Sequence, residues 1–312
     1  LTSLDLSNFN TKKITDMSRM FYQCNSLQYL NLESFDTSNV DDMTYMFSNC
    51  NSLERLDLSN FNTKRVNDMS YMFENCESLS TLKFNFDASE VIDMSYMFVN
   101  CYELVNLDLS NFNANKVRDM EKIFKNCYKL ENLDISSIKS DRLINIKNMF
   151  KSCSSLKSLD LSNLNTSHIK DMSNIFEECT SLENINLSNI DTSKVNTMKK
   201  MFSNCLSLTS LDLSGFNTNN VEKMSYMFQN CTKLTSLNLS NFLIPKVTEL
   251  DYMFSYDENL MSLDISNFNT SNCKTFTNIF EECRKLTVTL NGRKCANLLT
   301  SIPDYVNINY IG

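Results

Sequence analysis

The sequence predicts an α/β fold: a curved, right-handed solenoid with a parallel sheet on its concave side and short helices on its convex side. Three observations support this prediction. A 26-residue segment recurs along most of the chain, each copy begins with leucines at the spacing of a strand, and each copy ends with apolar residues at the spacing of a helix. One strand per copy, wound repeatedly, gives a parallel sheet.

The repeat covers residues 1–285 in eleven tandem copies. They start at Leu1, Leu27, Leu53, Leu79, Leu104, Leu130, Leu156, Leu182, Leu208, Leu234 and Leu260. Only the fourth copy is one residue short, within KFNFDASEV at 83–91. Residues 286–312 begin like a twelfth copy and then diverge, so we expect a C-terminal cap there. Because the chain opens inside a motif, we expect a signal, anchor or N-terminal cap to lie outside it.

The strand is expected in the first half of each copy. Counted from the first Leu of a copy, positions 1, 4 and 6 are nearly always leucine, as in Leu53, Leu56 and Leu58. Positions 4 and 6 have the two-residue period of a strand, so they should face inward and Asp57 between them outward.

A helix is expected in the second half. Apolar residues recur at offsets of 3, 6, 7 and 10, as in Val66, Met69, Met72, Phe73 and Cys76. This is the stripe of an amphipathic helix, and Asp68 precedes it as a helix N-cap. Helices pack about 8 to 10 Å apart and strands about 4.8 Å apart, so the strand face should be concave.

Ten of the twelve cysteines occupy position 24, on this apolar stripe. No CxxC pair is present, and cysteines on neighbouring helices would lie too far apart for disulfides. We therefore interpret them as buried free thiols. Cys273 is also assigned to the core, and a terminal disulfide that involves Cys295 is left as an alternative. Asp257 replaces the cysteine in the tenth copy, which also contains Pro245, so we expect that rung to be irregular.

The repeat pattern LxxLDLSxFxTxxVxDMSxMFxxC resembles the BspA-like bacterial leucine-rich repeats found in tandem in surface proteins. The resemblance covers residues 1–285. It implies a leucine-rich-repeat protein at the cell surface or secreted, used in adhesion.

Composition excludes several other classes. The net charge of −8 argues against nucleic acid as a partner, which requires clustered positive charge. No apolar run approaches the roughly 18 residues of a membrane span, so we expect no membrane insertion by this segment. The chain has no phosphate loop, nucleophile elbow or HExxH motif, and its only histidine, His168, lies in an exposed basic column. We expect neither an enzyme nor a bound cofactor or metal.

Three columns are candidate binding positions. The outward strand position 5 carries Asp57, Asp108, Asp134 and Asp160 among others. These carboxylates can recruit Ca²⁺ or a basic partner; the favoured alternative is that they bond neighbouring Ser and Asn. Positions 2 and 3 vary most between copies, as at Tyr29 and Arg55, and variation on a fixed scaffold allows specific contacts. Tyrosines recur at position 19, as Tyr45, Tyr71 and Tyr96, where either an interface or half-buried packing would explain them.

The resulting hypothesis is a surface binding module that recognises an extracellular protein or glycan. The alternative is a structural spacer or self-associating rod in a surface layer, which the uniform Ser, Asn and Asp columns motivate.

Overall fold

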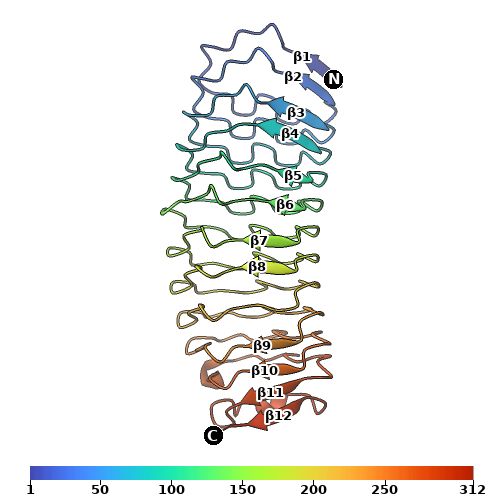
Figure 1. Cartoon of the computed structure of the whole chain (residues 1–312), viewed down its shortest axis with the longest axis vertical. Coiled ribbons are helices and arrows are strands. Elements are labelled where there is room, and N and C mark those ends of the chain that lie inside the picture. The colour runs from blue at the N-terminus through green and yellow to red at the C-terminus, as the bar shows by residue number, and fades with distance from the viewer. Residues whose placement is uncertain (312) are drawn as a thin grey trace. The chain divides into compact units, whose positions relative to one another are not determined.

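The computed structural model describes residues 1–311, which form two compact units, residues 1–156 and 157–311. Within each unit the chain winds so that each copy of the repeat lies beside the next, as Figure 1 shows. Each unit is therefore a stack of repeat rungs.

The first half of most copies forms a short strand, as predicted. The first unit contains β1 (Ser3–Asp5), β2 (Tyr29–Asn31), β3 (Arg55–Leu58), β4 (Thr81–Phe84), β5 (Asn106–Leu107) and β6 (Asn132–Leu133). The second contains β7 (Ser158–Asp160), β8 (Asn184–Asn186), β9 (Ser236–Asn238), β10 (Ser262–Asp264), the 3₁₀ turn η1 (Thr270–Asn272), β11 (Thr287–Leu290), the 3₁₀ turn η2 (Leu299–Ser301) and β12 (Asn307–Tyr310). All paired strands are parallel, and among β1 to β10 the paired strands place equivalent positions of the repeat opposite one another, such as Ser3 and Tyr29.

These strands do not form one continuous sheet. In the first unit they pair as β1 with β2, β3 with β4, and β5 with β6. In the second they pair as β7 with β8 and as a four-stranded sheet of β9 to β12. Within residues 1–156, no backbone hydrogen bond joins β2 to β3. The strand side is therefore interrupted.

The second half of each copy forms consecutive turns, so the predicted short helices and the α/β class are wrong. Alternate backbone N–H groups donate to the next rung: Met17 N–H lies 3.0 Å from the Asp42 carbonyl oxygen. The N–H groups between them close local turns, as Met20 does to the Met17 carbonyl at 3.3 Å. A helix would use these amides internally and leave none to join the rungs.

Two residues of every copy have the left-handed backbone that ends any right-handed helix. They lie at positions 19 and 23, for example Tyr71 at φ 59° and Asn75 at φ 57°. Left-handed conformations occur as single residues and not within helices. Two successive turns thus place the apolar residues at the spacing that the sequence had led us to interpret as a helix.

The turn side is bonded continuously within each unit. Parallel backbone bridges join Asp16 to Asp42, Asp42 to Asp68, and so on to Asn145, and in the second unit they run from Asp171 to Thr275. The wider helix spacing that predicted a concave strand side is therefore absent. Right-handed winding and curvature stay predictions from the sequence.

Burial follows the predicted columns although the element differs. Val66, Met69, Met72 and Phe73 are all fully buried. The Phe73 ring lies parallel to its equivalents in the adjacent rungs, with centroids 5.5 and 5.3 Å away. Each rung buries its flanks against its neighbours, as a repeat stack requires.

The position-24 cysteines form a ladder of thiol hydrogen bonds. Cys50 Sγ lies 3.2 Å from the carbonyl oxygen of Phe21, and Cys76 Sγ lies 3.2 Å from that of Phe47. Burial raises the pKa of Cys50 to about 12, so the thiol keeps the proton that it donates. All twelve cysteines within the described residues are free; Cys295 is buried and donates to the Phe268 carbonyl at 3.4 Å.

Asp257 occupies the same buried place as the cysteines. Its Oδ1 accepts the N–H of Cys231 at 2.7 Å, whereas its Oδ2 has no partner within the described residues. Burial raises the pKa of Asp257 well above 3.8, which favours the protonated carboxyl. The backbone here keeps the usual rung bond, from Tyr256 N–H to the Glu281 carbonyl at 2.7 Å. The irregularity that we expected is therefore absent at this position.

Candidate functional site: a hollow on the strand face

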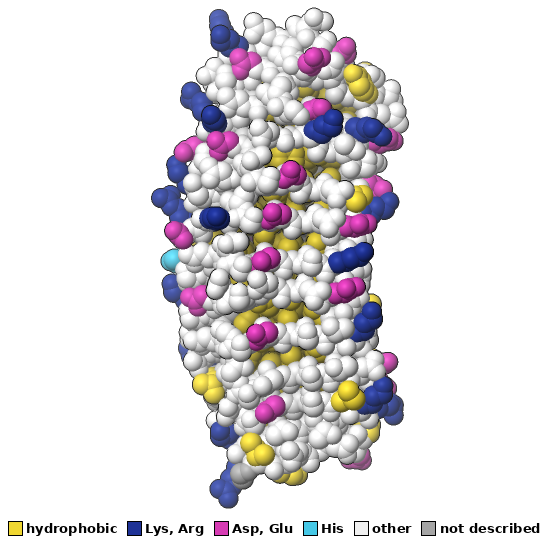
Figure 2. Space-filling view, in the orientation of Figure 1, with side chains coloured by type: hydrophobic (Ala, Val, Ile, Leu, Met, Phe, Trp, Pro, Cys, Tyr) yellow, Lys and Arg dark blue, Asp and Glu magenta, His cyan; other side chains and the backbone are white. Residues whose placement is uncertain are grey.

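The strand face of the second to fourth copies carries a hollow of about 670 Å³. Residues of β2, β3 and β4 line it, together with Gln28, Glu33, Glu54, Ser59 and Asn60. It opens where β2 and β3 lack a connecting backbone bond. In Figure 2, side chains of both charge signs lie close together on this face, and hydrophobic side chains show between the polar ones.

Strand alternation aims the polar side chains into the hollow. In β3, Leu56 and Leu58 are buried while Arg55 and Asp57 between them are exposed. In β2, Leu30 is buried and Tyr29 is exposed. Two of the predicted position-3 residues, Tyr29 and Arg55, therefore line the same hollow as the predicted carboxylate Asp57.

Asp57 is fixed by the residues that follow it. Its Oδ1 accepts the Ser59 N–H at 3.0 Å and the Ser59 hydroxyl at 2.6 Å. These hydrogen bonds lower the pKa of Asp57, with Lys83 adding a smaller effect. Asp57 Oδ2 lies 3.8 Å from Lys83 Nζ. The lowered pKa favours the ionised carboxylate, whose Oδ1 is held by Ser59 and whose Oδ2 lies near Lys83.

By comparison, the side chains of Tyr29 and Arg55 have no interaction partner within residues 1–311. Within the part of the chain that the structure describes, the Tyr29 ring has no aromatic or cationic neighbour, and the Arg55 guanidinium has no ion pair or hydrogen bond. Tyr29 is 55% exposed. A large ring and a rigid cation are both available to a partner here.

Lys83 was missed by the sequence reasoning. It stands at position 5 of the short fourth copy, where other copies carry Asp or Asn. In that copy a single residue, Asn85, stands between Phe84 and Phe86, where the third copy has both Ser59 and Asn60. The signal available in the sequence was a positive charge in a column that carries Asp or Asn in every other copy.

The remaining predicted carboxylates lie outside the hollow. Asp108, Asp134 and Asp160 each accept the N–H of the serine two residues on, at 2.9, 2.8 and 2.8 Å. These three carboxylates therefore bond neighbouring serines, as the alternative interpretation expects. Residues 1–311 contain no cluster of three or more His, Cys, Asp or Glu side chains arranged to hold a metal.

The predicted tyrosine column lies on the turn side and not in the hollow. Tyr45 and Tyr71 stack at 4.4 Å between centroids, and Tyr71 and Tyr96 at 4.5 Å. Arg19 lies 4.9 Å from the Tyr45 centroid at one end of the stack, and Lys122 lies 4.5 Å from that of Tyr96 at the other. Neighbouring rings and cations thus cover the ring faces, an arrangement that half-buried packing explains.

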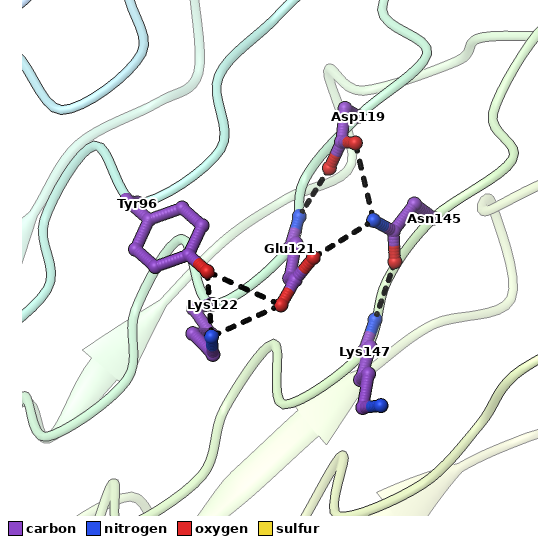
Figure 3. A network of polar contacts seen from close by, with 6 residues as sticks. All are labelled: Tyr96, Asp119, Glu121, Lys122, Asn145 and Lys147. Atoms are coloured by element: carbon purple, nitrogen blue, oxygen red, sulfur yellow. Dashed lines mark hydrogen bonds and ion pairs between the residues drawn. The ribbon is translucent and has the colours of Figure 1, made fainter.

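Figure 3 shows how completely the polar groups at the Lys122 end are used. Lys122 Nζ donates to the Tyr96 hydroxyl at 2.6 Å and pairs with Glu121 at 3.1 Å. The Asn145 amide donates to Asp119 and Glu121, both at 3.1 Å. Burial and the neighbouring carboxylates raise the pKa of Asp119. This network joins rungs and leaves few groups for a partner.

A second ladder on the turn side was also missed. The position-23 asparagines bond one another: Asn75 Nδ2 donates to Asn49 Oδ1 at 3.0 Å, and Asn100 Nδ2 to Asn75 Oδ1 at 2.6 Å. Asparagine tolerates the left-handed backbone better than most residues. Its recurrence just before cysteine was the signal in the sequence.

Comparison with known families identifies the repeat. The family model described as "Mycoplasma protein of unknown function, DUF285" matches residues 1–104, 83–161, 144–260 and 210–302. The chain belongs to the DUF285 family. No curated protein matches this DUF285 chain in sequence.

Several solved structures are similar to the DUF285 chain. The pneumococcal vaccine antigen PcpA has 13% identity and a TM-score of 0.42, covering 100% of this chain and 71% of that one. An LRR protein of Leptospira interrogans has 16% identity and a TM-score of 0.31, covering 99% and 90%. A leucine rich cell surface protein from Faecalibacterium prausnitzii has 15% identity and a TM-score of 0.34, covering 100% and 83%.

The described residues of the DUF285 chain include no helix with the length and apolar character needed to cross a membrane.

Proposed function

We propose that this DUF285 chain is a binding module of the cell surface or of a secreted protein, and that it recognises an extracellular partner through the strand-face hollow. The proposal rests on a contrast between side chains that have no interaction partner within residues 1–311 and side chains that bond one another. The side chains of Tyr29 and Arg55 have no partner among residues 1–311, whereas the side chains of the turn-side columns bond one another. Groups left unpaired on a rigid scaffold are the ones that a ligand can use.

The surface location and the adhesive role rest on the resemblance of the repeat to BspA-like leucine-rich repeats. No enzymatic activity is proposed, since the carboxylates of the strand face are evenly spaced and engaged with serine N–H groups. Surface exposure can be tested by protease treatment of intact cells. Cleavage of the chain while cytosolic markers stay intact supports it, and full protection would contradict it.

The binding role is tested by returning the hollow to the repeat consensus. Tyr29→Ser, Arg55→Ser and Lys83→Asp together install residues that other copies carry at positions 3 and 5. We expect the wild-type chain to retain a partner from extracellular matrix or serum and the triple variant to lose it. A control variant, Asn184→Ser in β8, should bind like the wild type. Equal retention by the triple variant would contradict a role for the hollow.

A structural spacer is the second candidate. It is favoured by the small polar residues, Ser, Thr or Asn, at position 3 of the other copies, such as Ser158, Ser236 and Ser262, which are exposed. A spacer predicts no specific retention by any variant. Sedimentation of the purified chain at increasing concentration separates a self-associating rod from a monomeric one.

A further inference from the structure

The hollow between β2 and β3 has the chemistry of a carbohydrate site. Its first requirement is an aromatic face that the protein does not itself use. The Tyr29 ring is 55% exposed and, within the described residues, has no stacking or cationic partner. Tyr45, Tyr71 and Tyr96 differ because neighbouring rings and cations cover their faces. An amphipathic ring of this kind can stack against the C–H face of a sugar.

The second requirement is a mixture of donors and acceptors around that ring. Arg55 and Lys83 supply donors, Asp57 and Glu54 supply acceptors, and the Gln28 amide supplies both. A hydroxyl group donates one hydrogen bond and accepts others, so it pairs with either kind of neighbour. Ligands with several adjacent hydroxyls therefore match this lining.

The charges of the hollow disfavour strongly charged ligands. A polyanion would meet Glu33, Glu54 and Asp57, and a polycation would meet Arg55 and Lys83. Like charges brought together at short range are unfavourable, and here both signs lie within one hollow. An uncharged ligand avoids both penalties.

The backbone adds further binding groups. Because no hydrogen bond joins β2 to β3 within residues 1–156, N–H and C=O groups on their facing edges are not satisfied by each other. Such groups need a partner, from water or from a ligand. The volume of about 670 Å³ lies in the range of sites for small ligands and is suited to a short oligosaccharide.

We propose that this hollow binds a neutral oligosaccharide, with Tyr29 as the stacking platform and Arg55 and Asp57 as hydrogen-bonding partners of its hydroxyls. This inference rests on the proposed binding function and specifies the ligand class.

The test is binding of the purified chain to an array of immobilised neutral hexose and N-acetylhexosamine oligosaccharides, with heparin oligosaccharides and extended peptides on the same surface. We expect one or more neutral glycans to bind, with little change between low and high salt because no net charge is neutralised. Titration calorimetry with the best glycan then measures the affinity. Tyr29→Ala should weaken it by about tenfold or more, and Arg55→Ser should also weaken it.

Two variants control for indirect effects. Tyr29→Phe keeps the ring and should keep most of the affinity. Tyr310→Ala removes a tyrosine of similar exposure, 58%, from β12 and should have no effect. Thermal unfolding of each variant checks that the fold is retained, and Tyr29→Ser, the residue of β1 and β7 at this position, replaces Tyr29→Ala if the alanine variant is unstable.

The outcomes separate this inference from the proposed function. No binding of neutral glycans above background, or equal affinity for Tyr29→Ala, overturns the inference. If the triple variant nevertheless loses a captured partner, the binding function stands and the ligand is of another class. Binding of heparin alone with steep salt dependence, or of peptides alone, also overturns it. If every variant still binds both the glycan and the captured partner, both proposals are overturned.

Discussion

The turn side and the strand side of each rung are built from the same repeat but satisfy their polar groups differently. On the turn side, backbone amides bridge every rung within a unit, and tyrosine, asparagine and cysteine side chains form parallel ladders. On the strand side, pairing is interrupted between β2 and β3, and two outward side chains of those strands, Tyr29 and Arg55, have no partner within residues 1–311. The continuous side maintains the stack, which allows the other side to vary.

Removing a ring from the turn-side core should produce the largest loss. Phe73→Ala deletes a fully buried ring stacked on both faces, so the free energy of unfolding should fall by about 3 to 5 kcal/mol. Urea unfolding followed by circular dichroism measures it. Phe9→Ala is the control, because Phe9 is 58% exposed and should cost far less. Similar losses for both would mean that ring burial does not determine the stability of the turn side.

Asp257 replaces a cysteine in the position-24 ladder and should make the fold less stable than a cysteine would. Asp257→Cys restores the common residue and removes a buried oxygen without a partner, so it should stabilise the chain by about 1 to 3 kcal/mol at pH 7. The pKa of the folded carboxyl is raised above 3.8. Its contribution to stability is therefore fully present below about pH 4 and is lost as the pH rises toward and through the folded pKa.

The stability difference between Asp257→Cys and the wild type should accordingly grow from pH 4 to pH 7. Urea unfolding of both chains at each pH measures it, and Asp257→Asn, which cannot ionise, is the control that should show the same flattened pH dependence. A constant difference across this range would show that Asp257 does not bury a titrating carboxyl.

The asparagine ladder should have an intermediate effect. Asn75→Ala removes two side-chain hydrogen bonds and places alanine at φ 57°, so we expect a loss of about 1 to 2 kcal/mol. Asn75→Gly should lose less, because glycine adopts positive φ without strain. Chemical unfolding of the pair separates the backbone part from the hydrogen bonds. If alanine were no worse than glycine, backbone strain would not explain the asparagine column.

The same contrast explains which features could be predicted from the sequence. The strand at Leu56 and Leu58 and the burial of Met69, Phe73 and Cys76 follow from apolar periodicity alone, which records the direction of each side chain. Periodicity does not record whether an amide bonds within its own rung or to the next. The helix was therefore predicted where Tyr71 and Asn75 adopt positive φ.

The candidate site was predictable in part for a related reason. Tyr29, Arg55 and Asp57 were found because they vary, or face outward, in a regular register. The hollow itself was not predicted, since it depends on a missing backbone pairing between β2 and β3 and on Lys83 in a shortened copy. Both are properties of how neighbouring rungs fit together.

The smallest change in stability is expected at the hollow, and it is the sharpest test of the contrast between the two sides. Tyr29→Ser and Arg55→Ser replace exposed side chains that bond nothing within residues 1–311 by the serine that β1, β7, β9 and β10 carry at the same position. Each should change the free energy of unfolding by less than about 0.5 kcal/mol, as substitutions at exposed sites without partners do.

Thermal and urea unfolding of these variants and of Asn75→Ala compares the loss in free energy of unfolding on the strand side with that on the turn side. A loss above about 1 kcal/mol at Tyr29 would mean that its ring supports the fold, since exposed residues that only serve a ligand do not contribute that much. The residue would then have a structural reason to be large, and its exposure would no longer favour binding. A negligible loss leaves recognition as the reason for a tyrosine and an arginine where other strands have serine, because nothing in the stack requires them.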